Sequence, residues 1–157
     1  MIRHGGINMT EDDRSIGKRW FDEVWNRGRR EAIGEMFPVD GVLHDGAHVT
    51  TGPGAFYQFY DRLQSAFSDC HVDVEDTIAE GDKLVVRWVC AARHTGDGLG
   101  VPPTGKSIEV SGISILRVTA SQIVEAWQNW DMLGMLEQIK GAGDSPTYVA
   151  EATHSSQ

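Results

Sequence analysis

One change of hydrophobic period along the chain constrains the fold more than any other feature. Apolar residues recur at helical spacing as far as Phe67, and from Cys70 onward they alternate with a period of two. The second half of the sequence then continues as a run of long strands. Helices that precede such a run predict an α+β domain, with the helices packed on one face of an antiparallel sheet.

The helical half is expected to hold three helices. The first covers residues 11 to 27, with Thr10 as N-cap and Asp13 completing a capping box. A short second helix covers 29 to 36 and stops before Pro38. One or two short strands lie within 41 to 51, around a turn at Asp45-Gly46. Pro53 opens the third helix, which covers 53 to 67.

The second half is expected to hold four strands, a loop and a last helix. The strands cover 71 to 78, 83 to 94, 107 to 118 and 122 to 130, and the helix covers 132 to 139. Residues 95 to 106 form a loop rich in Gly and Pro. The strand at 83 to 94 is so apolar that we expect both of its faces to be covered.

Length and charge limit the class of protein. At 157 residues the chain predicts one domain, which we place at 10 to 141, after a disordered leader (1 to 9) and before a flexible tail (142 to 157). A net charge of −9 without a cluster of Lys or Arg argues against nucleic acid and against an anionic membrane surface as partners. Cys70 and Cys90 form no CxxC motif, and no signal peptide is evident, so we expect a cytoplasmic protein with reduced cysteines.

Two motifs suggest sites that the local sequence argues against. Residues 100 to 107 match the spacing of a P-loop, but Pro102 and Pro103 have no N–H for a phosphate and a strand-like segment follows them. His44 and His48 have the spacing of two metal ligands on a helix, but they flank a turn and no carboxylate completes the set. We therefore expect neither a nucleotide site nor a metal site.

Polar residues alternate along the last strand. The side chains of Glu125, Trp127, Asn129 and Asp131 share one face if the strand is regular, and Val124, Ala126, Gln128 and Trp130 share the other. The first set fits either a solvent-exposed face or a pocket wall that holds an acid/base group. Asp131 also precedes the last helix and is suited to be its N-cap. The two roles can coexist.

Several other residues are candidates for a pocket. Arg87 lies in an apolar strand and requires an acidic partner, such as Glu125, Glu109 or Asp131. His94 ends the same strand and is placed to donate a hydrogen bond at a pocket rim. Four aromatic residues fit a core or a pocket lining suited to a flat polycyclic ligand, namely Trp20, Phe56, Tyr60 and Phe67.

The order of short motifs resembles one known family. These motifs are Glu80-Gly81-Asp82, Arg87-Trp88, His94-Thr95-Gly96, Pro102-Pro103-Thr104-Gly105, Gly112 and Glu125-x-Trp127-x-x-x-Asp131, preceded by Gly52-Pro53, Phe56 and Ala66-Phe67-Ser68-Asp69. Together they resemble the SnoaL-like polyketide cyclases, or ester cyclases, of the NTF2-like superfamily, over residues 16 to 141. The resemblance implies an NTF2-like cone, in which a curved antiparallel sheet wraps around N-terminal helices and leaves an internal pocket.

The resemblance also implies a reaction. It suggests cofactor-independent, metal-free ring closure of a polyketide ester by intramolecular aldol condensation, with Asp131 as general acid/base and Asn129, His94 or His44 steadying the enolate oxygen. Trp127, Arg87, Trp20, Phe56, Tyr60 and Phe67 would bind the small hydrophobic substrate. A homodimer or higher homo-oligomer is expected, because exposed sheet faces of this kind commonly pair.

Two alternatives remain open at this point. One is hydrolysis of an epoxide on the same fold, with Asp131, Asn129 and Arg87 holding a water molecule. The other is a non-catalytic domain that binds a small ligand, in which Asp131 is only a helix cap. The sequence departs from the family at 119 to 122, where relatives have an acidic turn, and at 91 to 93, where Ala-Ala-Arg replaces small polar residues.

Overall fold

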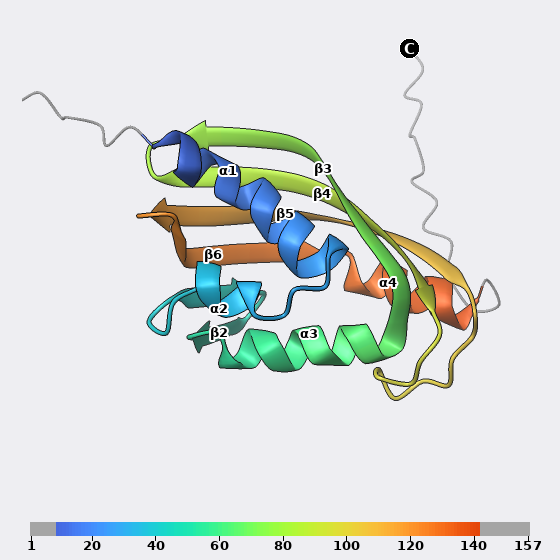
Figure 1. The fold of residues 1–157 in the computed structure, drawn as a ribbon. Coiled ribbons are helices and arrows are strands. Elements are labelled where there is room, and N and C mark those ends of the chain that lie inside the picture. Colours follow the sequence, from blue (N-terminus) through green and yellow to red (C-terminus); the bar gives the residue numbers. More distant parts are fainter. Residues whose placement is uncertain (1–8, 142–157) are drawn as a thin grey trace, which may run out of the picture.

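The computed structural model describes residues 9–141, which form four helical segments and a six-stranded sheet (Figure 1). The helical segments are α1 (Glu11–Arg19), which continues as η1 (Trp20–Asn26), α2 (Ala32–Met36), α3 (Gly54–Ala66) and α4 (Met132–Lys140). The strands are β1 (Val42–Asp45), β2 (His48–Thr51), β3 (Phe67–Glu80), β4 (Lys83–His94), β5 (Ser107–Thr119) and β6 (Gln122–Trp130). The α+β prediction and every predicted element are confirmed.

The sheet has the strand order β2-β1-β6-β5-β4-β3. Neighbours are antiparallel except β1 and β6, which run parallel. This pair departs from the purely antiparallel sheet that we expected. The departure is possible because α3 and four strands (β2, β3, β4 and β5) separate β1 from β6 in the chain, so no hairpin fixes their relative direction. In Figure 1, β3 and β4 bend together towards the end of α3, so the sheet is curved.

The predicted first helix is continuous but changes from an α-helix to a π-helix along its length. After α1 the backbone changes to a π-helix in η1, and the Arg27 N–H donates to the Asp22 carbonyl at 2.8 Å. Three side chains of η1 are buried in the core, namely Trp20, Phe21 and Val24. A β-carbon added to Gly17 would lie 2.9 Å from the Val86 side chain, so the helix approaches β4 closely because Gly17 has no side chain.

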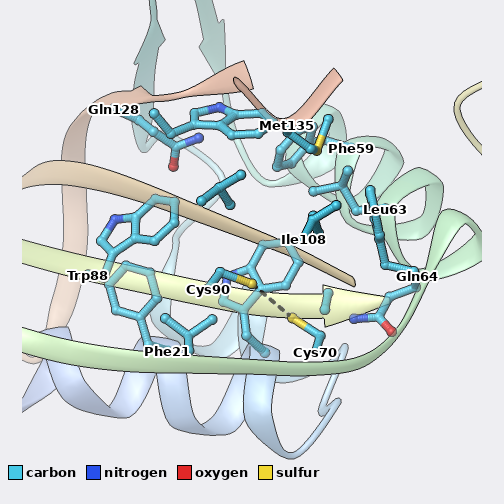
Figure 2. Close-up of a pocket in the computed structure, with 16 residues that line it drawn as sticks. Phe21, Phe59, Leu63, Gln64, Cys70, Trp88, Cys90, Ile108, Gln128 and Met135 are labelled. Carbon is cyan, nitrogen blue, oxygen red and sulfur yellow. Dashed lines mark hydrogen bonds between the residues drawn. The ribbon is translucent and has the colours of Figure 1, made fainter. Parts of the chain in front are cut away.

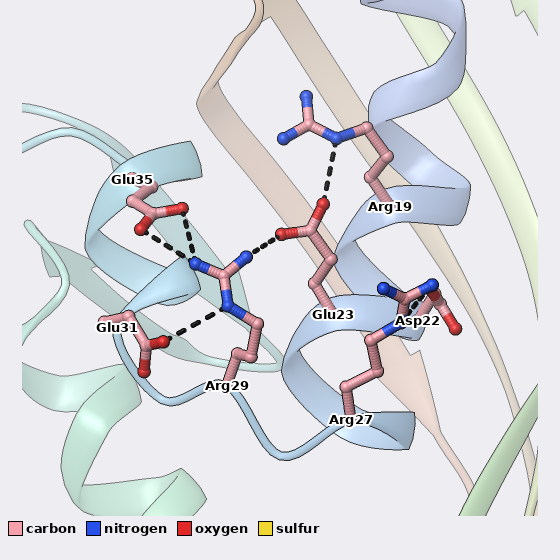
Figure 3. A network of polar contacts seen from close by, with 7 residues as sticks. All are labelled: Arg19, Asp22, Glu23, Arg27, Arg29, Glu31 and Glu35. Atoms are coloured by element: carbon pink, nitrogen blue, oxygen red, sulfur yellow. Dashed lines mark hydrogen bonds and ion pairs between the residues drawn. The ribbon is translucent and has the colours of Figure 1, made fainter.

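Arg29, in the turn between η1 and α2, holds that turn through ion pairs. The Arg29 guanidinium contacts Glu23 of η1 and also bonds Glu31 at 3.2 Å and Glu35 at 3.1 Å (Figure 3). Exposed ion pairs contribute little stability singly, but one guanidinium shared among three carboxylates restricts the geometry of the turn. The second helix accordingly begins at Ala32, three residues later than predicted.

Only one face of β4 is covered by the described part of the chain, whereas the sequence predicted that both would be. Leu84, Val86 and Trp88 are buried, while Arg87 and Arg93 between and beyond them are exposed. We call the buried side, against α1, η1 and α3, the inner face, and the opposite side the outer face. The outer face carries exposed apolar side chains, including Ile78 and Ile113.

The predicted ends of the domain fall mostly outside the described residues. The tail at 142 to 157 and residues 1 to 8 of the leader are not among them, so the bounds 10 to 141 stay a prediction. Met9, the last residue of the predicted leader, has its side chain buried in the core. Within residues 9–141 no helix is both long enough and apolar enough to cross a membrane.

Asp13 joins the start of α1 to the turn between β5 and β6. It completes the predicted capping box with Thr10, and its second carboxylate oxygen accepts the Ser121 N–H at 2.8 Å. Ala120 and Ser121 have φ angles of 51° and 59°, as a tight two-residue hairpin turn requires. These hydrogen bonds, from Ser121 first and Thr10 second, hold the pKa of Asp13 below its ordinary value of 3.8.

Replacing Asp13 with Ala should lower the free energy of unfolding by about 1–2 kcal/mol at neutral pH, because a buried cap and a turn contact are lost together. The folded-state pKa is depressed, so this stabilisation is present above pH 3.8 and is lost as the pH falls through the folded pKa. Urea unfolding of both proteins at pH 7 and at pH 3 measures the difference. A cost that is equal at the two pH values would contradict the assignment.

Candidate functional site

The main cavity lies between the helices and the inner face of the sheet and encloses about 70 Å³ (Figure 2). Seven elements contribute to its wall. The lining residues are Phe21 and Trp25 of η1, Phe59, Leu63 and Gln64 of α3, Phe67, Cys70 and Val72 of β3, Trp88, Cys90 and Ala92 of β4, Ile108 and Val110 of β5, Gln128 and Trp130 of β6, and Met135 of α4. The wall is therefore almost wholly apolar and rich in aromatic rings.

The position of Trp88 depends on its partners on β5. Its indole N–H donates to the buried Ser114 hydroxyl at 3.1 Å. A β-carbon on Gly112, which lies opposite Trp88 in the register, would come within 2.2 Å of the indole ring. Gly112 is thus required for the indole to lie against β5, which gives a physical reason for this family marker.

Polar groups are scarce in the main cavity. Its described lining includes no Asp, Glu, His, Lys or Arg, and the polar side chains are Gln64, Gln128 and the thiols of Cys70 and Cys90. Gln64 is exposed at the edge of the cavity, and Gln128 is half-buried. Within residues 9–141 the Gln128 amide has no hydrogen-bond partner. It is therefore available to a ligand.

Gln128 belongs to a polar row that crosses the inner face. On β5 it lies opposite Ser114, on β1 it lies beside Asp45, and Asp45 lies opposite His48 on β2. A second cavity, of about 100 Å³, borders this row and shares Gln128 and Phe59 with the main cavity. Asp45 and His48 both line it. These two are the titratable side chains in the described lining of this second cavity.

The alternation of β6 places the predicted catalytic stripe on the outer face. Ala126 is buried and Gln128 lines the cavity, so Trp127 and Asn129 between and after them point to the other side. Asn129, Asp131 and Arg87 do come together, in an open groove of about 390 Å³ on that side. The structure thus brings three predicted site residues into one groove but separates them from the aromatic cavity.

Asp131 is the N-cap of α4, as predicted. Its Oδ1 accepts the Gly134 N–H at 2.8 Å, and the residue is exposed. Arg87 is exposed rather than buried, and it pairs with Glu75 of β3 instead of the three partners that the sequence suggested. This correction has a simple cause, since β3 and β4 are adjacent and both side chains project from the outer face.

His44 and Trp127 form a second group on the outer face. Their rings stack at 5.1 Å with an angle of 2°, and His44 Nε2 lies 2.9 Å from the Glu125 carboxylate. His48 lies on the opposite side of the hairpin, because His44 is paired with Val49 and His48 with Asp45. The two histidines therefore do not converge on a common point.

The remaining predicted residues are distributed between the core and the cavities. His94 is fully buried, and its Nδ1 accepts the Thr104 N–H at 3.2 Å, so it anchors the 95 to 106 loop and does not line the main cavity. Phe67 lines the main cavity. Trp20 and Phe56 border a small void of about 30 Å³ behind it, and the Tyr60 hydroxyl donates to the Val24 carbonyl in the core.

Known proteins are similar to this chain in sequence and in fold. The sequence pattern of the SnoaL-like polyketide cyclases matches residues 16–139. The chain belongs to this family. It is similar to the nogalonic acid methyl ester cyclase of Streptomyces nogalater, with 29% identity over 122 residues, which covers 74% of this chain and 89% of that protein. It is also similar to the aklanonic acid methyl ester cyclase of Streptomyces peucetius, with 25% identity over 123 residues, which covers 74% of this chain and 83% of the relative.

Solved structures confirm the fold of this SnoaL-like chain. A protein from Jannaschia sp. CCS1 assigned to the SnoaL-like polyketide cyclases superposes with a TM-score of 0.76 over 90% of this chain and 99% of its own length, at 23% identity. The predicted NTF2-like architecture, a curved sheet around N-terminal helices with an internal pocket, is therefore correct.

The role of Asp131 as a helix cap can be measured directly. Asp131→Ala removes the hydrogen bond to Gly134 and should cost about 0.5–2 kcal/mol of unfolding free energy. Asp131→Asn keeps a side-chain oxygen that caps helices equally well and should cost much less. Thermal or urea unfolding of the two variants gives the comparison. Equal losses in both would show that the charge of Asp131, and not its capping bond, supports the fold.

Proposed function

We propose that the protein binds a flat, polyketide-derived ester in the main cavity and closes one of its rings by an intramolecular aldol reaction. The observation that carries the proposal is the aromatic cavity with a single half-buried amide, Gln128, at the junction with a cavity that holds Asp45. Membership of the SnoaL-like family and similarity to two ester cyclases support the substrate class. Rings of Phe21, Trp25 and Trp88 suit a planar ligand.

Substrate entry requires the cavity to widen. Its volume of about 70 Å³ lies well below the roughly 300–1,000 Å³ of typical ligand sites. The side of the wall formed by Leu63, Gln64 and Met135 consists of flexible side chains from α3 and α4 (Figure 2). Methionine in particular adapts its shape at low cost. We expect these side chains to move when the ligand binds.

Asp45 and Gln128 are suited to the proton transfer and to the developing charge. A proton on a carbon flanked by two carbonyls is acidic enough for a carboxylate to remove. Asp45 would take that proton, while the Gln128 amide N–H donates to the enolate oxygen. The enolate carbon then attacks the facing carbonyl carbon and forms the new C–C bond. The resulting alkoxide recovers the proton from Asp45, so the reaction consumes no other reagent.

Asp131 is the alternative general base, acting in the outer groove with Asn129 and Arg87. Two features favour Asp45 over it. Asp131 already accepts a helix N–H, and the Arg87 guanidinium is paired with Glu75. The outer groove is also more open and more polar than a site for a flat apolar ligand requires. The same groove would hold the water molecule in the hydrolytic alternative.

Asp45→Asn should lower kcat for ring closure by about 10²–10⁴-fold with little change in KM, because it removes the general base and keeps the shape. Nogalonic acid methyl ester and aklanonic acid methyl ester are the substrates to test, with product formation followed by chromatography and absorbance. Asp73→Asn, an exposed carboxylate on β3, is the matched control and should keep full activity. Loss of activity in Asp131→Asn with normal turnover in Asp45→Asn would transfer the role to Asp131.

Gln128→Leu preserves the size of the side chain and removes its hydrogen bonds. It should lower kcat/KM by about 10–10³-fold, since one enolate donor is lost. Gln64→Leu at the exposed edge of the cavity is the control and should have a small effect. If wild-type protein binds these esters, as seen by quenching of tryptophan fluorescence, but never converts them, the non-catalytic binding alternative replaces the cyclase proposal. The absence of carboxylates, histidines, lysines and arginines from the described lining of the main cavity is the observation that favours this alternative.

A further inference from the structure

Two thiols meet inside the wall of the main cavity. The sulfur atoms of Cys70 on β3 and Cys90 on β4 are 3.4 Å apart, and both residues line the cavity (Figure 2). They are the two cysteines of the chain, and both are half-buried. Neither the aldol chemistry nor the packing of the aromatic wall requires two thiols in contact.

An irregularity in β3 creates the contact. Ser68 pairs with Arg93 and His71 pairs with Ala91, so β3 advances three residues where β4 advances two. The additional residue is a β-bulge, and Asp69 within it has a φ of 54°. In an unbroken register Cys70 would lie opposite Ala92 and only diagonal to Cys90, a spacing too wide for a disulfide. The bulge brings the diagonal pair together.

We propose that Cys70 and Cys90 are a redox modification site, which a hydroperoxide converts to an intramolecular disulfide in the cavity wall and which thiols reduce again. The sulfur atoms must approach by about 1.4 Å to reach the S–S bond length of about 2.05 Å. The bulge supplies that movement because the local β3 backbone lacks regular ladder pairing there. This inference is independent of the ring-closing function.

The two thiols have unequal chemical roles. A hydrogen bond from Cys90 lowers the pKa of the Cys70 thiol, while donation of that bond and burial raise the pKa of Cys90. Cys70 is therefore the thiolate that attacks the peroxide. Its sulfur displaces hydroxide from the O–O bond and becomes a sulfenic acid. The Cys90 sulfur then attacks it, the S–S bond forms and a second water leaves, so two electrons and two thiol protons pass to one peroxide molecule.

The oxidant can reach the pair through the cavity. A void of about 70 Å³ exceeds the roughly 10–15 Å³ that one water molecule needs, so a small peroxide fits within it. Gln64, which is exposed, forms part of the same lining and marks a side open to solvent. Large disulfides such as oxidised glutathione should react much more slowly than hydrogen peroxide, because the wall excludes them.

The test treats the folded full-length chain with one to five equivalents of hydrogen peroxide at pH 7.5. Thiol titration should fall from two per chain to zero, intact mass should fall by about 2 Da, and dithiothreitol should restore both. The melting temperature should rise by about 5–10 °C in the oxidised protein, because a 21-residue loop is closed. Peptide mapping should show Cys70 linked to Cys90 in a monomeric chain.

Single variants provide the controls and the discriminating outcomes. Cys90→Ser should stop at a sulfenic acid on Cys70, which dimedone traps, while Cys70→Ser should react at least tenfold more slowly. Two thiols that persist in folded wild-type protein, a disulfide between two chains, or oxidation that begins only in denaturant would each overturn the proposal. None of these results would change ring closure by Asp45, so the two proposals fail separately.

Discussion

The pairing register of β6 with its two neighbours decides what the cavity contains. Because side chains alternate along a strand, a shift by one residue would exchange the whole inner set for the outer set. β6 is held on both sides, antiparallel to β5 and parallel to β1, so Gln128 is fixed between Ser114 and Asp45. The carboxylate of Glu125 is fixed on the outer face by the same pairing, and Asp131, just after the strand, lies in the groove on that side. The chemistry available inside the fold thus follows from this one register.

The parts of this fold that could be predicted are those determined by residues close together in the sequence. Helical spacing and the Thr10–Asp13 capping box each act over a few residues, and the structure has both. The choice of inner face on β6 is not local. Both stripes of that strand mix polar and aromatic residues, so their periodicity gives no sign of which one meets the helices. Parallel pairing with β1, whose residues come 83 positions earlier in the chain, settles the question and could not be derived from pattern.

The prediction that both faces of β4 are covered was wrong for a related reason. Val85 and Val89 extend the run of apolar residues along β4. In the described chain both lie on the outer face, where they are half-buried and Arg87 between them is exposed. A buried arginine would need a desolvated partner, whereas an exposed one needs only a neighbour such as Glu75. The position of Arg87 in the middle of the strand was thus the signal that one face is open. Family resemblance identified the fold correctly but said nothing about that exposure.

In the proposed ring closure, a cavity whose described lining has no carboxylate or histidine would have to gain most of the rate from positioning the substrate. Holding a nucleophilic carbon against its carbonyl in a well-oriented complex is equivalent to effective concentrations of about 10⁵–10⁸ M. Aromatic walls that accept only a folded, planar chain can supply this without a charged group. In the proposed reaction the proton is already acidic, so one carboxylate, Asp45 of the second cavity, would be enough to move it, and one amide, Gln128, would be enough to steady the oxygen. An apolar cavity with its polar groups confined to one row of the sheet is therefore compatible with the proposed ring closure.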